Sequence, residues 1–191
     1  MTKHPTNNPV SLGLWIYLMS DCILFATLFA TYAVLHLETA GGPSALQLFD
    51  RSFVLIETLI LLASSFTCGL AVLFSRNKNV VGMTIALFTT FLLGLSFVGM
   101  EYSEFGKLAM EGHGWQASAF LSSYFTLVGT HGLHIIIGLL WLLVLLAHIS
   151  IQGGTEQTTR RIFYFSLFWH FLDIVWIFIF SFVYLFGTLS L

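Results

Sequence analysis

The chain has 191 residues, of which 57% are hydrophobic and only 8% are charged, and its mean hydropathy is +0.90. Soluble domains carry about a quarter charged residues, so this composition excludes a water-soluble globule and predicts a membrane protein. Lys and Arg number 7 against 9 Asp and Glu, and no basic run indicates nucleic-acid binding. Both cysteines, Cys22 and Cys68, lie in apolar stretches, which favours buried structural residues over a disulfide framework or a metal site.

Five apolar stretches are long enough to cross a bilayer, because a hydrocarbon core of ~30 Å needs about 20 helical residues. In chain order they are residues 12–37, 53–74, 80–100, 119–149 and 162–189. A transmembrane β-barrel would instead need alternating strands of about 10 residues, and the sequence has no such alternation. We therefore predict an all-α fold, a polytopic membrane helix bundle with five transmembrane helices that forms a single membrane domain over residues 1–191.

The first span follows a short polar N-terminal segment. Its apolar run, residues 12–37, is too long for the core of a signal peptide and contains Asp21. We expect this run to be a retained span.

The loops between the spans predict the orientation of the bundle, because basic residues gather on the cytoplasmic side. The side of the N-terminus carries five basic residues, which are Lys3, Arg76, Lys78, Arg160 and Arg161. The second side carries Arg51 and Lys107. A loop over residues 101–116 is expected on the second side, where it would hold Glu101 and Glu104. This bias places the N-terminus in the cytoplasm and the C-terminus outside, which for a bacterial inner membrane is the periplasm.

Ionisable side chains inside the spans are the most informative residues, since a central charge costs about 2.5–3.5 kcal/mol to insert and should face a protein partner. The spans contain Asp21, Glu57, His131, His134, His170 and Asp173. His170 and Asp173 share one helix face, and a neutral imidazole can donate to the carboxylate. We predict that the six residues form an interior polar network.

The fourth span also carries a stripe of small and polar residues at every fourth position. Its members are Ser118, Ser122, Thr126, Thr130, His134 and Gly138. Small residues at this spacing let helices approach closely, and their hydroxyls can hydrogen-bond across the contact. The spacing therefore predicts a helix-packing seam along this face.

A metal or haem site is the alternative role for the histidines. Helical bundles that hold two metals use Glu-x-x-His motifs, which no span contains, and bis-histidine haem would need His131 or His134 to face His170 at matching depth. A proton or ion path through the buried carboxylates is a third alternative. We favour the hydrogen-bond network, and we predict no catalytic, cofactor-binding or metal-binding residue in this chain.

Three long motifs resemble subunit III of the haem–copper respiratory oxidases. They are "WIYLMSDCILFATLFATYAVL", "GTHGLHIIIGLLWL" and "SLFWHFLDIVWIFIFSFVYL". The cytochrome c oxidase branch has seven spans, a glutamate at the position of Asp21 and an asparagine at that of Glu57. The five-span form with Asp is most similar to subunit III of the cytochrome bo type ubiquinol oxidases, followed by a menaquinol oxidase subunit.

The resemblance implies a non-catalytic subunit of a proton-pumping quinol oxidase, which supports assembly and the stability of subunit I and binds phospholipid. The haems and copper would belong to subunit I, with subunit II and a small subunit IV as further partners and quinol as the substrate of the complex. Asp21 matches the carboxylate of the family that reacts with hydrophobic carbodiimides. A stand-alone channel or carrier that uses the buried carboxylates is the alternative function.

Overall fold

The computed structural model describes residues 9–39, 41, 51–112 and 114–186. Its helices are α1 (Pro9–Leu35), α3 (Arg51–Arg76), α4 (Val80–Met110), α5 (Ala119–Gln152) and α6 (Glu156–Ile179), and α6 continues as the π-helix η1 (Phe180–Phe186). Five of the described helical segments are long and apolar enough to cross a membrane, and the described residues contain no strand. The predicted all-α bundle with five spans is confirmed.

The third span is longer than predicted. The expected loop over residues 101–116 is wrong for its first ten residues, because α4 continues to Met110. No Pro interrupts this segment, and its helix-compatible sequence "EYSEFGKLAM" runs on to Gly112, which has φ +79°. Glu101 and Glu104 are therefore buried residues of α4, with exposed fractions of 4% and 9%, rather than loop residues.

Local capping bonds fix where the other helices begin and end. The side chains of Asn79, Ser118 and Thr155 accept hydrogen bonds from backbone N–H groups at the starts of α4, α5 and α6. Gly153, with φ +64°, ends α5 in a conformation that favours glycine. These caps explain how α3–α4 and α5–α6 reverse direction within a few residues.

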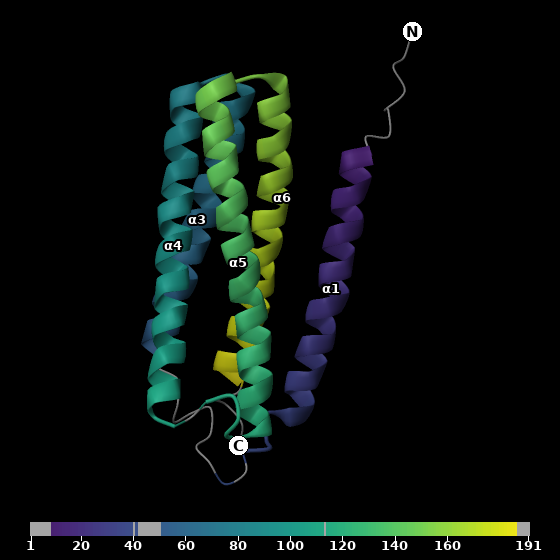
Figure 1. Ribbon diagram of the computed structural model, residues 1–191, viewed down its shortest axis with the longest axis vertical. Coiled ribbons are helices and arrows are strands. Elements are labelled where there is room, and N and C mark those ends of the chain that lie inside the picture. Colours follow the sequence, from purple (N-terminus) through teal and green to yellow (C-terminus); the bar gives the residue numbers. More distant parts are fainter. Residues whose placement is uncertain (1–8, 40, 42–50, 113, 187–191) are drawn as a thin grey trace.

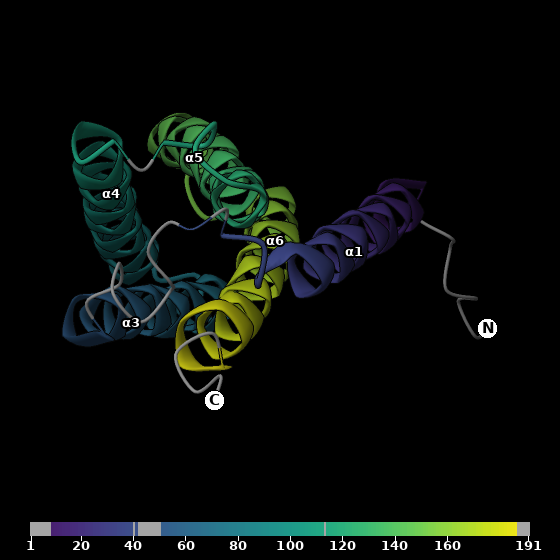
Figure 2. The ribbon, with the colours of Figure 1, turned by 90° about the horizontal axis from the view of Figure 1, so that it is seen from below.

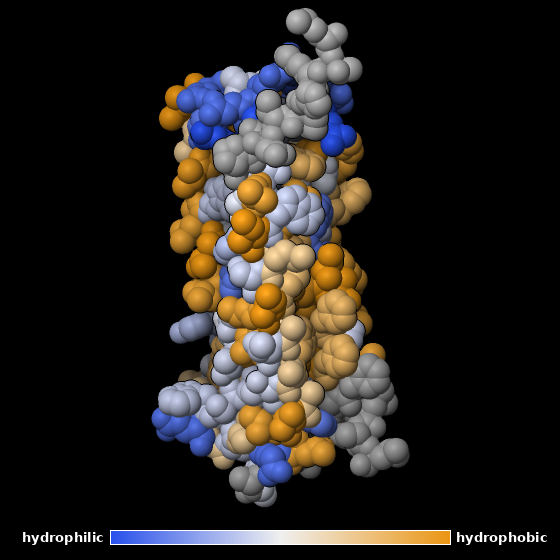
Figure 3. Space-filling model, turned by 90° about the vertical axis from the view of Figure 1, so that its right-hand side faces the viewer, coloured by the Kyte–Doolittle hydropathy of each residue, from blue (hydrophilic) through white to orange (hydrophobic). Residues whose placement is uncertain are grey.

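Four of the helices, α3 to α6, form an antiparallel bundle, and α1 packs on its side against α5 and α6 (Figures 1 and 2). The N-terminal end of α1 leans away from the bundle (Figure 1). The alternation of direction brings Arg76, Lys78, Arg160 and Arg161 to one end, as the charge pattern requires. Figure 3 shows hydrophilic residues gathered at the two ends and a largely hydrophobic middle. Lys3, which the charge argument also uses, lies outside the described residues.

The topology can be tested with single cysteines at Thr39, Asn77, Glu111 and Gln157, chosen because none is a glycine with a strained backbone. We expect Thr39 and Glu111 to react from outside the cell with an impermeant thiol reagent. Asn77 and Gln157 should react only after the membrane is opened. Labelling of Asn77 and Thr39 from the same side would overturn the orientation.

Trp169 of α6 forms the centre of the core, where its side chain is 1% exposed and its N–H donates to the hydroxyl of Ser64 at 3.1 Å. Two neighbouring helices meet the ring through glycines. A Cβ at Gly94 of α4 would lie 3.0 Å from the indole, and one at Gly138 of α5 would lie 2.9 Å from it. Close approach of these helices therefore requires the absence of a side chain at both positions.

We expect Gly94→Ala to destabilise the protein by about 1 kcal/mol, because the indole is held by its hydrogen bond and cannot move away freely. Gly99→Ala on the same helix is the matched control, since nothing lies within 4 Å of its Cβ position. The measurement is the thermal unfolding midpoint in detergent. Equal midpoints for the two variants would show that the contact with Trp169 relaxes without cost.

Candidate functional site

Asp21 and His134 meet between α1 and α5, near the middle of both helices. His134 Nε2 lies 3.6 Å from Asp21 Oδ2, and both side chains are buried, with 11% and 7% of their surfaces exposed. Phe25 packs on the imidazole, with ring centroids 5.3 Å apart. The contact therefore joins α1 to the bundle through a polar pair surrounded by apolar side chains.

The backbone fixes which nitrogen of His134 carries a proton. His134 Nδ1 lies 2.7 Å from the carbonyl oxygen of Thr130, and a carbonyl can only accept, so Nδ1 donates. In a neutral ring Nε2 is then an acceptor that faces Asp21. The 3.6 Å between Nε2 and Asp21 Oδ2 is longer than a hydrogen bond, so the two groups are in close polar contact.

His131 lies one turn before His134 on α5, is completely buried and faces α6. Its Nε2 donates to the carbonyl oxygen of Leu172 in α6 at 3.2 Å, and Nδ1 has no hydrogen-bond partner among the described residues. Trp176 packs against the ring at 5.1 Å between centroids, and Phe97 meets it edge-on at 5.8 Å. His131 thus links α5 to α6 in an aromatic environment.

His170 and Asp173 lie between α6 and α3, where Ser65 joins them. The Ser65 hydroxyl lies 2.6 Å from His170 Nδ1 and also interacts with the Asp173 carboxylate. We predicted a hydrogen bond from imidazole to carboxylate within one helix, whereas both side chains bond a serine of the neighbouring helix. That serine could not be identified from the spacing of His170 and Asp173.

Glu57 lies inside the contact of α3 with α4 and is 0% exposed. Neither of its carboxyl oxygens has a hydrogen-bond partner among the described residues. It interacts electrostatically with Glu101 and Glu104, which the extension of α4 brings to the same level. The Lys107 ammonium, one turn further along α4, lies 5.2 Å from the centroid of the Phe53 ring.

Glu104 takes part in a chain of buried hydroxyls that the sequence did not reveal. The Tyr184 hydroxyl donates to Glu104 Oε2 at 3.1 Å, and the Tyr124 hydroxyl lies 2.9 Å from that of Tyr184. Because Tyr184 belongs to η1, this chain holds the end of the last span against α4 and α5. The regular spacing of buried residues along α4, including Phe97, Glu101, Glu104 and Leu108, is the signal that could have identified it.

The predicted seam of α5 is only partly at helix contacts. Gly138 and His134 are buried against α6 and α1, but Thr126 is exposed and Ser122 and Thr130 are half-buried. The hydroxyls of Thr126 and Thr130 donate to carbonyls four residues earlier in their own helix, and Ser118 caps it. Spacing alone did not distinguish hydroxyls that face a neighbouring helix from those that bond their own.

The six predicted residues therefore occupy separate helix contacts in the described part of the chain, instead of one continuous network. Among the described residues, no group of three or more His, Cys, Asp and Glu side chains is arranged to hold a metal ion. The arrangement supplies interhelical hydrogen bonds and one close polar pair, Asp21 with His134.

A family model described as cytochrome c oxidase subunit III matches residues 2–188. The chain belongs to this family. Subunit III proteins of several bacteria are similar to it over most of their length. The cytochrome bo(3) ubiquinol oxidase subunit 3 of Pseudomonas aeruginosa is 57% identical, over 97% of this chain and 89% of that protein.

Two other relatives are named as subunits of oxidases with different electron donors, quinol and cytochrome c. The quinol oxidase subunit 3 of Bacillus subtilis is 49% identical over 92% of this chain and 86% of that protein. The cytochrome c oxidase subunit 3 of Bacillus sp. (strain PS3) is 44% identical over 94% of this chain and 86% of that protein. The family resemblance proposed from the three sequence motifs is confirmed.

Proposed function

We propose that this chain is the non-catalytic subunit III of a proton-pumping quinol oxidase, the terminal oxidase that couples quinol oxidation to the reduction of oxygen to water. The observation that carries the proposal is the 57% identity to the subunit 3 of a ubiquinol oxidase, against 44% to that of a cytochrome c oxidase. A second relative at 50% identity is also named a ubiquinol oxidase subunit 3, which favours ubiquinol as the electron donor of the complex.

The buried polar groups support an accessory role. The hydrogen bonds of His131, His134 and His170 go to a backbone carbonyl or to a serine. The bonds of His131 and His170 join neighbouring helices, and that of His134 stays within α5, so all three imidazoles serve as hydrogen-bonding groups of the bundle. We propose that the haems and copper reside in subunit I, and that subunit II, a small subunit IV and phospholipid are the other partners.

The proposed location is the inner membrane of a bacterium, with the N-terminus cytoplasmic. The exposed apolar side chains of α1, among them Trp15, Ile16, Met19 and Ile23, leave a surface that lipid or a partner subunit can cover. A stand-alone channel is less well supported, because the buried carboxyls Asp21 and Glu57 lie at separate helix contacts, α1–α5 and α3–α4.

Purification of the tagged chain in mild detergent tests the proposal. We expect larger subunits with haem absorbance to co-purify and the preparation to consume oxygen when quinol is added. A chain that purifies alone from cells with normal quinol oxidase activity would overturn it. Haem absorbance that stays with the separated chain, and is lost on replacing His131 or His170, would overturn the non-catalytic assignment.

A further inference from the structure

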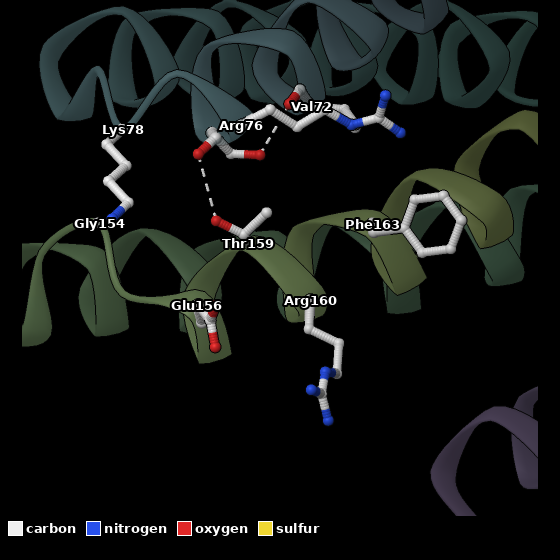
Figure 4. A pocket seen from close by; sticks show the side chains of 9 residues that line it. Val72, Arg76, Lys78, Gly154, Glu156, Thr159, Arg160 and Phe163 are labelled. Atoms are coloured by element: carbon white, nitrogen blue, oxygen red, sulfur yellow. Dashed lines mark hydrogen bonds between the residues drawn. The ribbon is translucent and has the colours of Figure 1, made fainter. Parts of the chain in front are cut away.

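Charged side chains lie in different surroundings at the two ends of the bundle. At one end Arg76, Lys78 and Arg160 are exposed and point in different directions around a pocket, so each is a separate surface charge (Figure 4). Toward the other end three carboxyl groups are enclosed between helices. They are Glu57, Glu101 and Glu104, with exposed fractions of 0%, 4% and 9%, and we call them the carboxyl cluster. Charge at membrane depth is costly, so the cluster has to be neutralised.

Glu57 and Glu101 have no partner that would stabilise a negative charge. Both carboxyl oxygens of Glu57 and Oε1 of Glu101 lack a hydrogen-bond partner among the described residues, and no ion pair within these residues includes either side chain. Glu57 belongs to α3, and it interacts electrostatically with both glutamates of α4. The Glu101 carboxyl packs on the α5 backbone, since a Cβ at Gly132 would lie 2.6 Å from its Oε1.

Protons are the simplest source of neutralisation for these two side chains. A buried carboxylate without a hydrogen bond or a cation is far less stable than the neutral acid, so this kind of burial favours the protonated form. In the part of the chain that the structure describes, no three His, Cys, Asp and Glu side chains are arranged to hold a metal ion. We therefore expect Glu57 and Glu101 to carry protons.

Glu104 differs from the other two carboxyls because it has partners for a charge. The Tyr184 hydroxyl of η1 donates to its Oε2 at 3.1 Å, and the Tyr124 hydroxyl of α5 lies 2.9 Å from that of Tyr184. Glu104 also interacts electrostatically with the exposed Lys107 ammonium. A hydrogen-bond donor and a nearby cation both stabilise a carboxylate, so Glu104 is the member of the cluster that can hold a negative charge.

One face of α4 connects the cluster with the surface. Glu101, Glu104 and Lys107 are spaced by three residues, so they share this face and follow one another toward the end of the helix. Each step rises about 4.5 Å, a separation that a single water molecule can bridge. In the other direction the next buried residue of this face is Phe97, which cannot carry a proton. The titratable residues of this face therefore lead from the surface to the cluster and end there.

We propose that the carboxyl cluster is a proton-holding site that exchanges protons with the water at the Lys107 end of the bundle. At neutral pH Glu57 and Glu101 carry the protons, and Glu104 is the carboxylate through which protons enter and leave. In one exchange a hydronium ion gives its proton to Glu104, which passes it to a deprotonated Glu101 or Glu57, so one O–H bond breaks for each that forms. This role goes beyond the accessory function proposed above and rests on it only for placement of the chain in a membrane.

The test is infrared spectroscopy of the chain purified with its co-purifying subunits, because the carbonyl stretch of a protonated carboxyl is absent from a carboxylate. The spectrum of each variant is subtracted from that of the unmodified protein at neutral pH. We expect Glu57→Gln and Glu101→Gln each to lose one protonated-carboxyl band that shifts in D₂O. Glu104→Gln should keep both bands and slow their shift after transfer to D₂O, because it interrupts the connection with the surface.

Glu111→Gln is the matched control, since Glu111 is an exposed carboxyl at the same end of α4, and it should leave both bands and their exchange unchanged. Glu57→Asp and Glu101→Asp keep a carboxyl and should move each band without removing it, which provides a second readout where a glutamine variant assembles poorly.

Unchanged protonated-carboxyl bands in the glutamine and aspartate variants of Glu57 and Glu101 would show that these side chains are ionised and would overturn the proposal. An unchanged exchange rate in Glu104→Gln would contradict the connection through Glu104. The bands are measurable whether or not haem subunits co-purify, so a failure of the proposed function is seen separately.

Discussion

Asp21→Leu is expected to weaken retention of this chain in the purified oxidase and to shorten activity over successive turnovers. The physical reason lies in His134, whose Nδ1 is bound to the Thr130 carbonyl and whose Nε2 faces Asp21. Leucine offers no hydrogen, so it leaves a buried acceptor without a partner at a cost of about 1–3 kcal/mol. The measurement is oxygen consumption over time, with subunit content followed by gel.

Asp21→Asn is the matched control, because an amide N–H₂ can donate to Nε2 as a protonated carboxyl does. We expect an assembled oxidase with near-normal initial turnover. An amide cannot exchange a proton as a carboxyl does. A fully assembled Asp21→Asn enzyme without initial activity would therefore assign Asp21 to the proton path of the reaction and refute its structural role.

Glu57→Met is expected to stabilise the chain by about 1–3 kcal/mol, because it removes a buried carboxyl that has no hydrogen-bond partner among the described residues. Glu104→Met should instead destabilise the chain, because Glu104 accepts a hydrogen bond from Tyr184 that methionine cannot replace. The two positions occupy the same α3–α4 region and receive the same side chain. Thermal unfolding of the two variants in detergent measures the difference.

Destabilisation by Glu57→Met would show that this carboxyl has a partner in the native protein, such as a bound water or a group of another subunit. A stabilised Glu57→Met variant with reduced oxidase activity would assign Glu57 a role in the complex that outweighs its cost. Equal midpoints for Glu104→Met and the unmodified chain would show that the bond from Tyr184 contributes nothing.

The helices could be predicted from the sequence because apolar length alone determines which segments cross a membrane. The third span was too short in the prediction because it was ended at the first charged residue, Glu101. In the structure the buried face continues through Glu101, Glu104 and Leu108, and burial inside the bundle lets the carboxyls remain in the helix.

Five of the six polar residues predicted inside the spans are buried and His170 is half-buried, but their partners could not be predicted. Which helices are neighbours is a property of the tertiary packing, so Ser65 beside His170 and the Leu172 carbonyl beside His131 could not be read from local spacing. The threonines of α5 show the same limit, since Thr126 satisfies its hydroxyl within its own helix. Spacing predicts which residues share a face, and the fold decides what that face meets.

The most direct test of a non-catalytic role is the initial rate of quinol-driven oxygen consumption after this chain has been released from the assembled oxidase with mild detergent. We expect the remaining complex to keep its full haem content and a near-normal initial rate, and then to lose activity faster over successive turnovers than the intact enzyme. Complete loss of the initial rate, with the haems still in place and activity regained on adding the chain back, would contradict the accessory role.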